Sequence, residues 1–174
     1  MDSREIKPVF SAEEIAARVH DIGREIRRTN GENEVFLLGI LKGTSFLMAD
    51  LMRAVSGVVG YGFIDVIRDS ADQVTDALEI DFLSYTDIRN RNVYVLKDVV
   101  ATGIIENYLL TQLRMHHPAS LHLVALLDRQ DARTVDVKTD FSLFSIDTDA
   151  SFAGYGLEYE GRFGNLPFLG RVQA

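Results

Sequence analysis

The fold of this chain can be inferred from the sequence VYVLKDVVATGII at residues 93–105. Its first four residues are apolar, as expected for a strand that is buried on both faces of a sheet. The stretch then becomes polar at Lys97 and Asp98, and Thr102-Gly103 precedes a helical pattern over about residues 104–116. A buried strand that runs through a short loop into a helix is the repeating unit of α/β domains with a parallel sheet.

The same alternation extends in both directions along the chain. Apolar residues at helical intervals predict a helix over residues 12–28, which begins after the capping-box residues Ser11 and Glu14. A second helix follows the loop Lys42-Gly43-Thr44. Its residues Phe46, Met48 and Met52 are predicted to face the core. Further strands are predicted at residues 35–41, 58–66, 78–84, 121–127 and 141–146.

These elements predict one α/β domain over residues 1–174, with a mostly parallel twisted sheet flanked by helices. A chain of 174 residues with 47% hydrophobic and 25% charged residues is ordinary for such a domain. The absence of cysteine excludes disulfides, thiolate metal sites and a cysteine nucleophile.

Charge and hydropathy argue against two classes of partner, nucleic acids and membranes. The chain carries 18 Lys+Arg against 26 Asp+Glu, a net charge of −8 without a basic run, which argues against general nucleic-acid binding. No apolar run approaches the ~20 residues that a membrane span needs, and the polar N-terminus does not resemble a signal peptide. We therefore expect a cytoplasmic protein without a membrane partner. The few lysines are Lys7, Lys42, Lys97 and Lys138.

Polar residues follow three of the predicted strands. These are Lys42-Gly43-Thr44, the stretch 98–103 and Asp128-Arg129. Ligands of open α/β sheets bind at the carboxyl ends of the strands, where such residues gather. Thr102-Gly103 at a helix start leaves backbone N–H groups free for a phosphate. The same pair also serves as an ordinary helix cap and tight turn, and its spacing does not separate the two interpretations.

Several segments together resemble the hypoxanthine-guanine phosphoribosyltransferases. LGILKGTSFLMADL at residues 38–51 is similar to that family's pyrophosphate loop, and DVVATG at residues 98–103 to its phosphoribosyl-pyrophosphate loop. The C-terminal half follows the family in order and spacing at residues 126–129, 135–141, 154–159 and 165–167. The resemblance covers nearly the whole chain.

The resemblance implies a type I phosphoribosyltransferase fold with a small hood built from the chain ends. It implies a purine-salvage protein that binds phosphoribosyl pyrophosphate and a 6-oxopurine or its nucleotide. Family members transfer ribose 5-phosphate to purine N9 and release pyrophosphate with the help of Mg²⁺. They are commonly homo-oligomers, either dimers or tetramers.

The resemblance also assigns site residues. It implies that the Leu41–Lys42 peptide bond is cis, that Lys42 and Gly43 bind pyrophosphate, and that Asp98 and Glu158 hold the metal. Phe152 and Tyr155 would hold the base, with Arg129 reading its O6 atom and Glu158 alongside. The phosphate-binding residues would be Ala101, Thr102, Gly103, Ile104 and Ile105.

The chain departs from the family pattern at several of these positions. Lys97 stands where the family has the first of two adjacent acids, and Ala101 stands where it has the acid of proton transfer. The remaining departures are Ile105 for Thr, Arg129 for Lys, Ser151 for the stacking aromatic, Glu158 for Asp, Gly164 for an Arg (with Arg162 nearby), and residues 65–70 without the lid's Ser-Tyr pair.

Two hypotheses follow from these departures. One is a phosphoribosyltransferase with impaired or altered turnover, because general acid–base help is worth about 10²–10⁴-fold. The other is a catalytically inactive paralogue that acts as a nucleotide or phosphoribosyl-pyrophosphate sensor or as a regulatory partner. In either case the Lys97 ammonium is expected to replace part of the charge that magnesium would bring.

Overall fold

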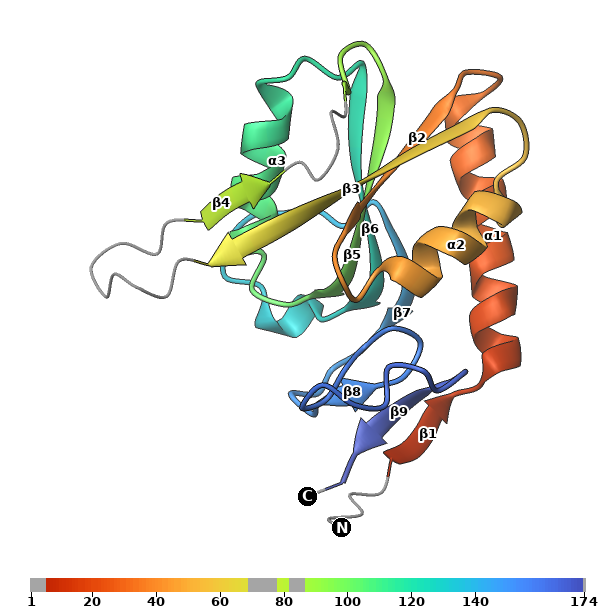
Figure 1. Cartoon of the computed structure of the whole chain (residues 1–174), viewed down its shortest axis with the longest axis vertical. Helices are drawn as coiled ribbons and strands as arrows, with labels where there is room; N and C mark the ends of the chain where they lie inside the picture. Colours follow the sequence, from red (N-terminus) through yellow and green to blue (C-terminus); the bar gives the residue numbers. More distant parts are fainter. Residues whose placement is uncertain (1–5, 69–77, 82–86, 174) are drawn as a thin grey trace.

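The computed structural model describes residues 6–68, 78–81 and 87–173. Its main sheet has the strand order β4-β3-β2-β5-β6-β7 (Figure 1). Five of these strands are parallel, and β4 pairs antiparallel with β3 at one edge. The strands are β2 (Val35–Ile40), β3 (Val59–Arg68), β4 (Leu78–Asp81), β5 (Asn92–Val100), β6 (Ser120–Asp128) and β7 (Phe141–Ser145). The predicted α/β fold class is confirmed.

Helices cover both faces of the main sheet (Figure 1). The helices α1 (Ala12–Asn30) and α2 (Ser45–Ala54) pack on one face, and α3 (Ile104–Arg114) packs on the other. Neighbouring residues of β2 divide between the two cores, with Leu37 on the α1/α2 side and Leu38 on the α3 side. A strand buried on both faces needs an unbroken apolar run, which explains the composition of β2 and β5.

A second, smaller sheet joins the two ends of the chain. It consists of β1 (Ile6–Phe10), β9 (Leu169–Val172) and β8 (Phe152–Ala153), paired antiparallel in that order. We call this sheet the hood. It lies below β7 in Figure 1, and the rings of Phe10 and Phe144, 4.0 Å apart and stacked, connect it to the main sheet. The expectation of a hood from the chain ends is therefore confirmed.

Most predicted boundaries agree with the observed elements within a few residues. The predicted capping box is present, because Glu14 N donates to Ser11 Oγ (3.2 Å) and Ser11 N donates to Glu14 Oε2 (2.7 Å). The predicted strand 78–84 is described only as far as Asp81, and its last three residues lie outside the described part of the chain.

The prediction that Phe46 belongs to the core is wrong. Phe46 is 45% exposed, whereas Met48, two residues later on the same helix, is 2% exposed. Phe46 lies in the first turn of α2, close to the loop that follows β8. Its ring centroid is 6.0 Å from that of Tyr155 in this loop.

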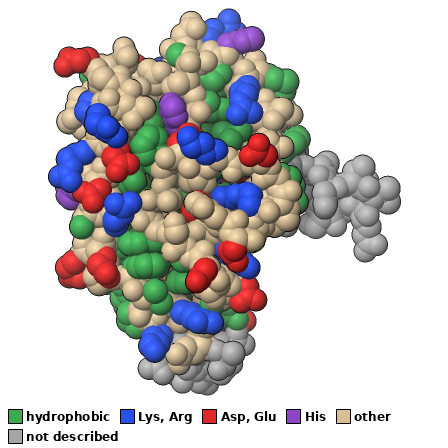
Figure 2. All heavy atoms as spheres, turned by 180° about the vertical axis from the view of Figure 1, so that it is seen from behind, with side chains coloured by type: hydrophobic (Ala, Val, Ile, Leu, Met, Phe, Trp, Pro, Cys, Tyr) green, Lys and Arg blue, Asp and Glu red, His purple; other side chains and the backbone are tan. Residues whose placement is uncertain are grey.

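Charged side chains of both signs are interspersed over the face shown in Figure 2. None of the helices in the described ranges is long and apolar enough to cross a membrane.

A hydrogen bond attaches the hood side of the molecule to α2. The Tyr155 hydroxyl donates to Asp50 Oδ2 over 2.6 Å, and Tyr155 is only 5% exposed. Burial, together with the Asp50 carboxylate, raises the pKa of Tyr155 far above its ordinary value, so the hydroxyl stays a donor at any physiological pH. We expect this contact to stabilise the packing of the loop after β8 against the main sheet.

Replacing Tyr155 by Phe removes this hydrogen bond and leaves the ring in place. We expect the free energy of unfolding to fall by about 1.5–3 kcal/mol, the usual contribution of a hydrogen bond to a charged group. Chemical denaturation measures the change. Tyr61→Phe is the matched control, because Tyr61 is 57% exposed on β3 and should lose almost nothing. Equal effects of the two substitutions would contradict this role for Tyr155.

Candidate active site

A short loop of residues 101–103 connects β5 to α3, and we call it the phosphate loop after the role that the resemblance implies. Gly103 is the N-cap residue of α3, with φ +81°, a left-handed conformation that glycine adopts without a steric penalty. A Cβ at this position would lie only 3.0 Å from Arg133 Cδ, so a larger residue would also press on the Arg133 side chain. The neighbouring Thr102 is exposed, and its hydroxyl accepts from Ile104 N over 3.4 Å. The loop therefore presents a hydroxyl and the N-terminal end of a helix, where amides without intrahelical partners attract anions.

The Arg133 side chain holds this loop in place. Its Nη1 donates to the Ala101 carbonyl (2.7 Å), and its Nη2 donates to Asp128 Oδ1 (2.5 Å). Thr134 N donates to the Thr102 carbonyl (3.0 Å), which adds a second tether. Sequence reasoning missed Arg133. The sequence does contain a signal that could have found it. Asp128 ends an apolar strand, and a carboxylate buried there needs a cation as its partner.

The Lys42-Gly43 loop faces the end of β5. The Leu41–Lys42 peptide bond is cis, as the resemblance implied. A Cβ on Gly43 would overlap the Asp98 carboxylate, so this close approach requires glycine. Thr44 is fully buried and donates its hydroxyl proton to the Ile40 carbonyl over 2.6 Å, which closes the turn into α2. The Lys42 side chain remains exposed at the mouth of the site.

Lys97 and Asp98 pair with each other at the end of β5. The Lys97 ammonium contacts Asp98 Oδ1, and Val99 N donates to the same oxygen over 2.8 Å. The two side chains are 17% and 27% exposed. The Asp98 carboxylate therefore carries a protein cation as its partner, which reduces the negative charge it offers to a metal ion.

Two cavities share the residue Glu158, which lines both. The first, of about 320 Å³, we call the Arg129 cavity. Three residues named by the resemblance meet in it, namely Arg129, Phe152 and Glu158. Its other lining residues include Val99, Ala101, Leu127, Asp149, Ala150, Ser151, Leu157 and Tyr159.

The second, of about 380 Å³, we call the Lys42 cavity, and Arg162 lines it with Lys42. Gly164, which stands where the family has an arginine, is in the same wall. Arg162 therefore lies in the cavity where that arginine would act.

Tyr155 does not take part in the Arg129 cavity, so the expectation that it holds a base is wrong. Its hydroxyl is bound to Asp50, and its ring is buried between α2 and the hood. Phe152 remains as an aromatic wall, because it lines the cavity and is only partly buried. The lid stretch 65–70 falls partly outside the described residues, at Asp69 and Ser70.

Not all hydrogen-bond donors of the Arg129 guanidinium are paired within the described residues. Its Nε atom is buried and makes no hydrogen bond within the described part of the chain, although Asp131 Oδ1 lies 3.5 Å away. An unsatisfied buried donor is costly unless a partner arrives. A guanidinium in this position suits a carbonyl oxygen on a ligand, because it presents several donors in one plane.

The cavities contain few acids. The carboxylates that line the Arg129 cavity are Asp149 and Glu158, and the lining residue that the loop contributes, Ala101, carries only a methyl group. Across residues 6–68, 78–81 and 87–173, no three His, Asp or Glu side chains converge as a metal site.

Comparison with known proteins agrees with this geometry. The family model of the phosphoribosyl transferase domain matches residues 6–160. The hypoxanthine-guanine phosphoribosyltransferase of Bacillus subtilis is 31% identical over 94% of this chain and 91% of the relative. The hypoxanthine phosphoribosyltransferase of Salmonella typhimurium is 33% identical over 91% of this chain and 90% of the relative.

A solved structure shows the same architecture. The crystal structure of a hypoxanthine-guanine phosphoribosyltransferase from Bacillus anthracis, with a HEPES molecule in its active site, superposes with a TM-score of 0.87 at 29% identity. The match covers 97% of this chain and 100% of that one. From the family match and these relatives together, the chain belongs to the phosphoribosyl transferase domain family, among its hypoxanthine-guanine phosphoribosyltransferases.

Proposed function

We propose that this protein binds phosphoribosyl pyrophosphate and a 6-oxopurine, or the corresponding nucleotide, and transfers the ribose 5-phosphate slowly. The observation that carries the proposal is the glycine-capped loop 101–103, held by Arg133 directly beside the Arg129 cavity. The names of the relatives support the choice of purine, because they are hypoxanthine or hypoxanthine-guanine phosphoribosyltransferases.

Each part of the ligand has a matching surface. The Thr102 hydroxyl and the amides through Ile105 would bind the 5-phosphate, as helix N-termini do. Lys42, with Arg162 in the same cavity, would bind pyrophosphate. Phe152 would contact the base, and the Arg129 guanidinium, which lines the same cavity, would hydrogen-bond its 6-oxo group.

Magnesium fits this arrangement through one protein carboxylate. Mg²⁺ is commonly held by one or two carboxylates together with substrate phosphates and water. Glu158 meets this description because it lines both cavities, whereas Asp98 is already paired with Lys97. When bound, the ion would neutralise charge on the departing pyrophosphate. The Lys97 ammonium supplies part of that charge from the protein itself.

The chemistry of proton transfer is weakened in this site. Ala101 has no atom that accepts a proton, and it occupies the wall of the Arg129 cavity where the resemblance places an acid. Loss of a general base costs about 10²–10⁴-fold in rate. Positioning and electrostatics remain, so we propose binding close to that of the family and a much lower turnover.

Glu106 does not replace the missing acid. Lys97 follows Val95 by two residues on β5, so its side chain starts from the sheet face that α3 covers. Glu106 is on the buried face of α3 and is only 3% exposed. Its carboxyl therefore faces the sheet rather than the Arg129 cavity. Burial raises the pKa of Glu106, and the positive charges of Lys97 and Arg133 oppose this only in part.

A second function is supported by the same observation about Ala101. A protein with a phosphate loop and no proton acceptor would bind nucleotide and signal its presence instead of turning it over. Sensor or regulatory partner is therefore the alternative to slow transfer. Residence in the cytoplasm and assembly into a dimer or tetramer stay predictions from the family.

Calorimetry and a turnover assay on the same preparation test the proposed function. We expect guanosine or inosine monophosphate and phosphoribosyl pyrophosphate to bind, with Thr102→Val weakening nucleotide binding about tenfold through loss of a charge-assisted hydrogen bond. Thr111→Val is the control, because its hydroxyl bonds to the Asn107 carbonyl within α3. Binding without any turnover of hypoxanthine or guanine would select the sensor. No binding of either ligand would refute both functions.

Restoring the two acids is expected to raise turnover. The double variant Lys97→Glu with Ala101→Asp should gain at least about 10²-fold in kcat, the lower end of what general acid–base help provides. Lys138→Glu makes the same change of charge as Lys97→Glu, at a side chain that is 85% exposed, and should leave kcat unchanged. An unchanged rate in a double variant that still binds nucleotide would show that the acids are not what limits this enzyme.

The buried carboxyl of Glu106 makes stability depend on pH in a defined direction. Because its pKa in the folded state is raised, the folded protein favours the protonated form, and this stability is lost as the pH rises through the folded pKa. Glu106→Gln should therefore be more stable than the native protein at pH 8. The difference should vanish below about pH 4, under the unfolded pKa of Glu. Thermal unfolding across this range measures it, with the exposed Glu25→Gln as control.

A further inference from the structure

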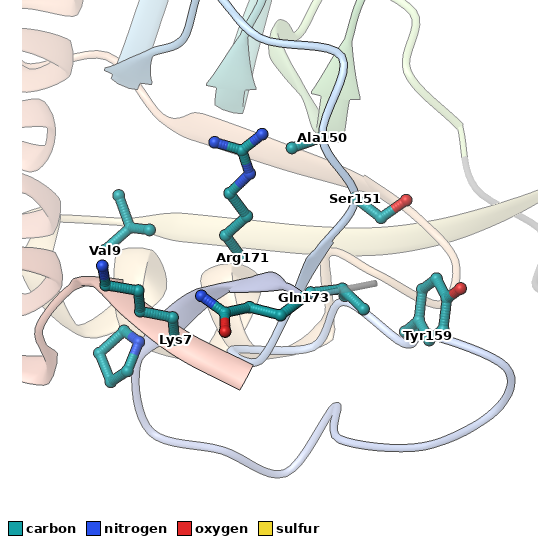
Figure 3. Close-up of a pocket in the computed structure, with 9 residues that line it drawn as sticks. Lys7, Val9, Ala150, Ser151, Tyr159, Arg171 and Gln173 are labelled. Carbon is teal, nitrogen blue, oxygen red and sulfur yellow. The ribbon is translucent and has the colours of Figure 1, made fainter. Parts of the chain in front are cut away.

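A cavity of about 960 Å³ lies on the hood, and no role in the proposed function uses it. Figure 3 shows Lys7 and Arg171 extending into it from β1 and β9, with Ser151 and Tyr159 across from them. We call it the hood cavity. Its other lining residues are Pro8, Val9, Ala150, Val172 and Gln173.

Two cations occupy opposed positions on the neighbouring strands β1 and β9. Lys7 and Arg171 are direct partners in the antiparallel register of β1 and β9. Directly opposed residues of an antiparallel pair have Cβ atoms about 4.5–5.5 Å apart, and like charges in that arrangement are destabilising. The hood therefore contains a repulsive pair at a position where an Asp or Glu would be favourable.

Neither cation is neutralised by the part of the protein that the structure describes. The side chains of Lys7 and Arg171 make no hydrogen bond or ion pair with the described residues, although the chain has a net charge of −8. Among the described residues that line the cavity there is no carboxylate. The two cations, a serine hydroxyl and the Gln173 amide supply several hydrogen-bond donors and a local positive charge.

The hood cavity adjoins the Arg129 cavity. Ala150, Ser151 and Tyr159 line both. Ala150 and Ser151 are small, and Ser151 stands where the family resemblance expects a bulky aromatic side chain. The wall between the two cavities is therefore made partly of small residues in this chain.

We propose that Lys7 and Arg171 form an anion subsite of the hood, which binds a phosphate or carboxylate group beside the Arg129 cavity. The bound anion would remove the repulsion between the two cations and accept their hydrogen bonds, which are strengthened by charge. The anionic group comes either from a separate ion or ligand or from an acidic substituent on a purine that occupies the Arg129 cavity.

Nitrogen-15 NMR of the full chain tests the proposal residue by residue. Inorganic phosphate is the first probe, and a 6-oxopurine that carries a carboxyalkyl substituent is the second. We expect a saturable shift of the Arg171 Nε–H signal and of the Lys7 and Gln173 amides. Lys7→Met should weaken this binding about tenfold, because one of the two charges is lost. Lys138→Met is the matched control and should leave it unchanged.

The two probes and the phosphate loop separate the outcomes. A response to phosphate alone identifies a separate anion, and a response only to the substituted purine identifies an acidic substituent. Signals of Thr102 to Ile105 report the proposed active site independently, so failure at one site is distinguishable from failure at the other. The proposal would be overturned if the Arg171 signals do not move. It would also be overturned if they shift linearly with probe concentration, by the same amount in the native protein and in Lys7→Met. Either result counts even if the phosphate loop responds.

Discussion

The Asp128 carboxylate at the end of β6 is 1% exposed, and the guanidinium of Arg133 is its charge partner. A buried ion pair is favourable only when further hydrogen bonds satisfy both groups, because each charge loses its hydration. Here the remaining Arg133 donors reach the Ala101 carbonyl and Thr139 Oγ1, and Gln130 Nε2 donates to Asp128 Oδ2. One residue thus satisfies a buried acid and fixes the phosphate loop. The shape of the site depends on this pair more than on any residue expected to touch ligand.

The end of β5 shows how the charge of the site is altered while its shape is kept. Gly43 lies against the Asp98 carboxylate, and Gly103 keeps the left-handed conformation that starts α3. Both requirements concern the backbone, and both are met. Lys97 changes the charge next to Asp98 without disturbing either loop, because its ammonium finds that carboxylate. A binding surface can therefore persist after the groups for proton transfer have gone, since the two depend on different atoms.

The hood brings together residues that are far apart in the sequence. β1 and β9 pair Lys7 with Arg171, and β8 adds Phe152 opposite Arg171 on the other side. Three side chains from three strands thus form one row that extends from the Arg129 cavity to the hood cavity. In this protein the hood contributes charge as well as cover, and that charge is opposite in sign to the net charge of the chain.

The sequence by itself determined the α/β class, because apolar runs and helical periodicity are local patterns that burial imposes on each strand and helix. It also located the turns at Thr102-Gly103 and Lys42-Gly43, since turns that need glycine leave a mark at their own positions, whereas their roles toward phosphate came from the family resemblance. Only the tertiary structure decided that Arg133 holds the phosphate loop, that Tyr155 binds Asp50 instead of facing a base, that Phe46 is exposed, and that Lys7 opposes Arg171. The physical reason is common to all four. Each depends on which residue from a distant element lies within a few ångströms, and that distance is set by how strands pair and helices pack, which no local pattern encodes.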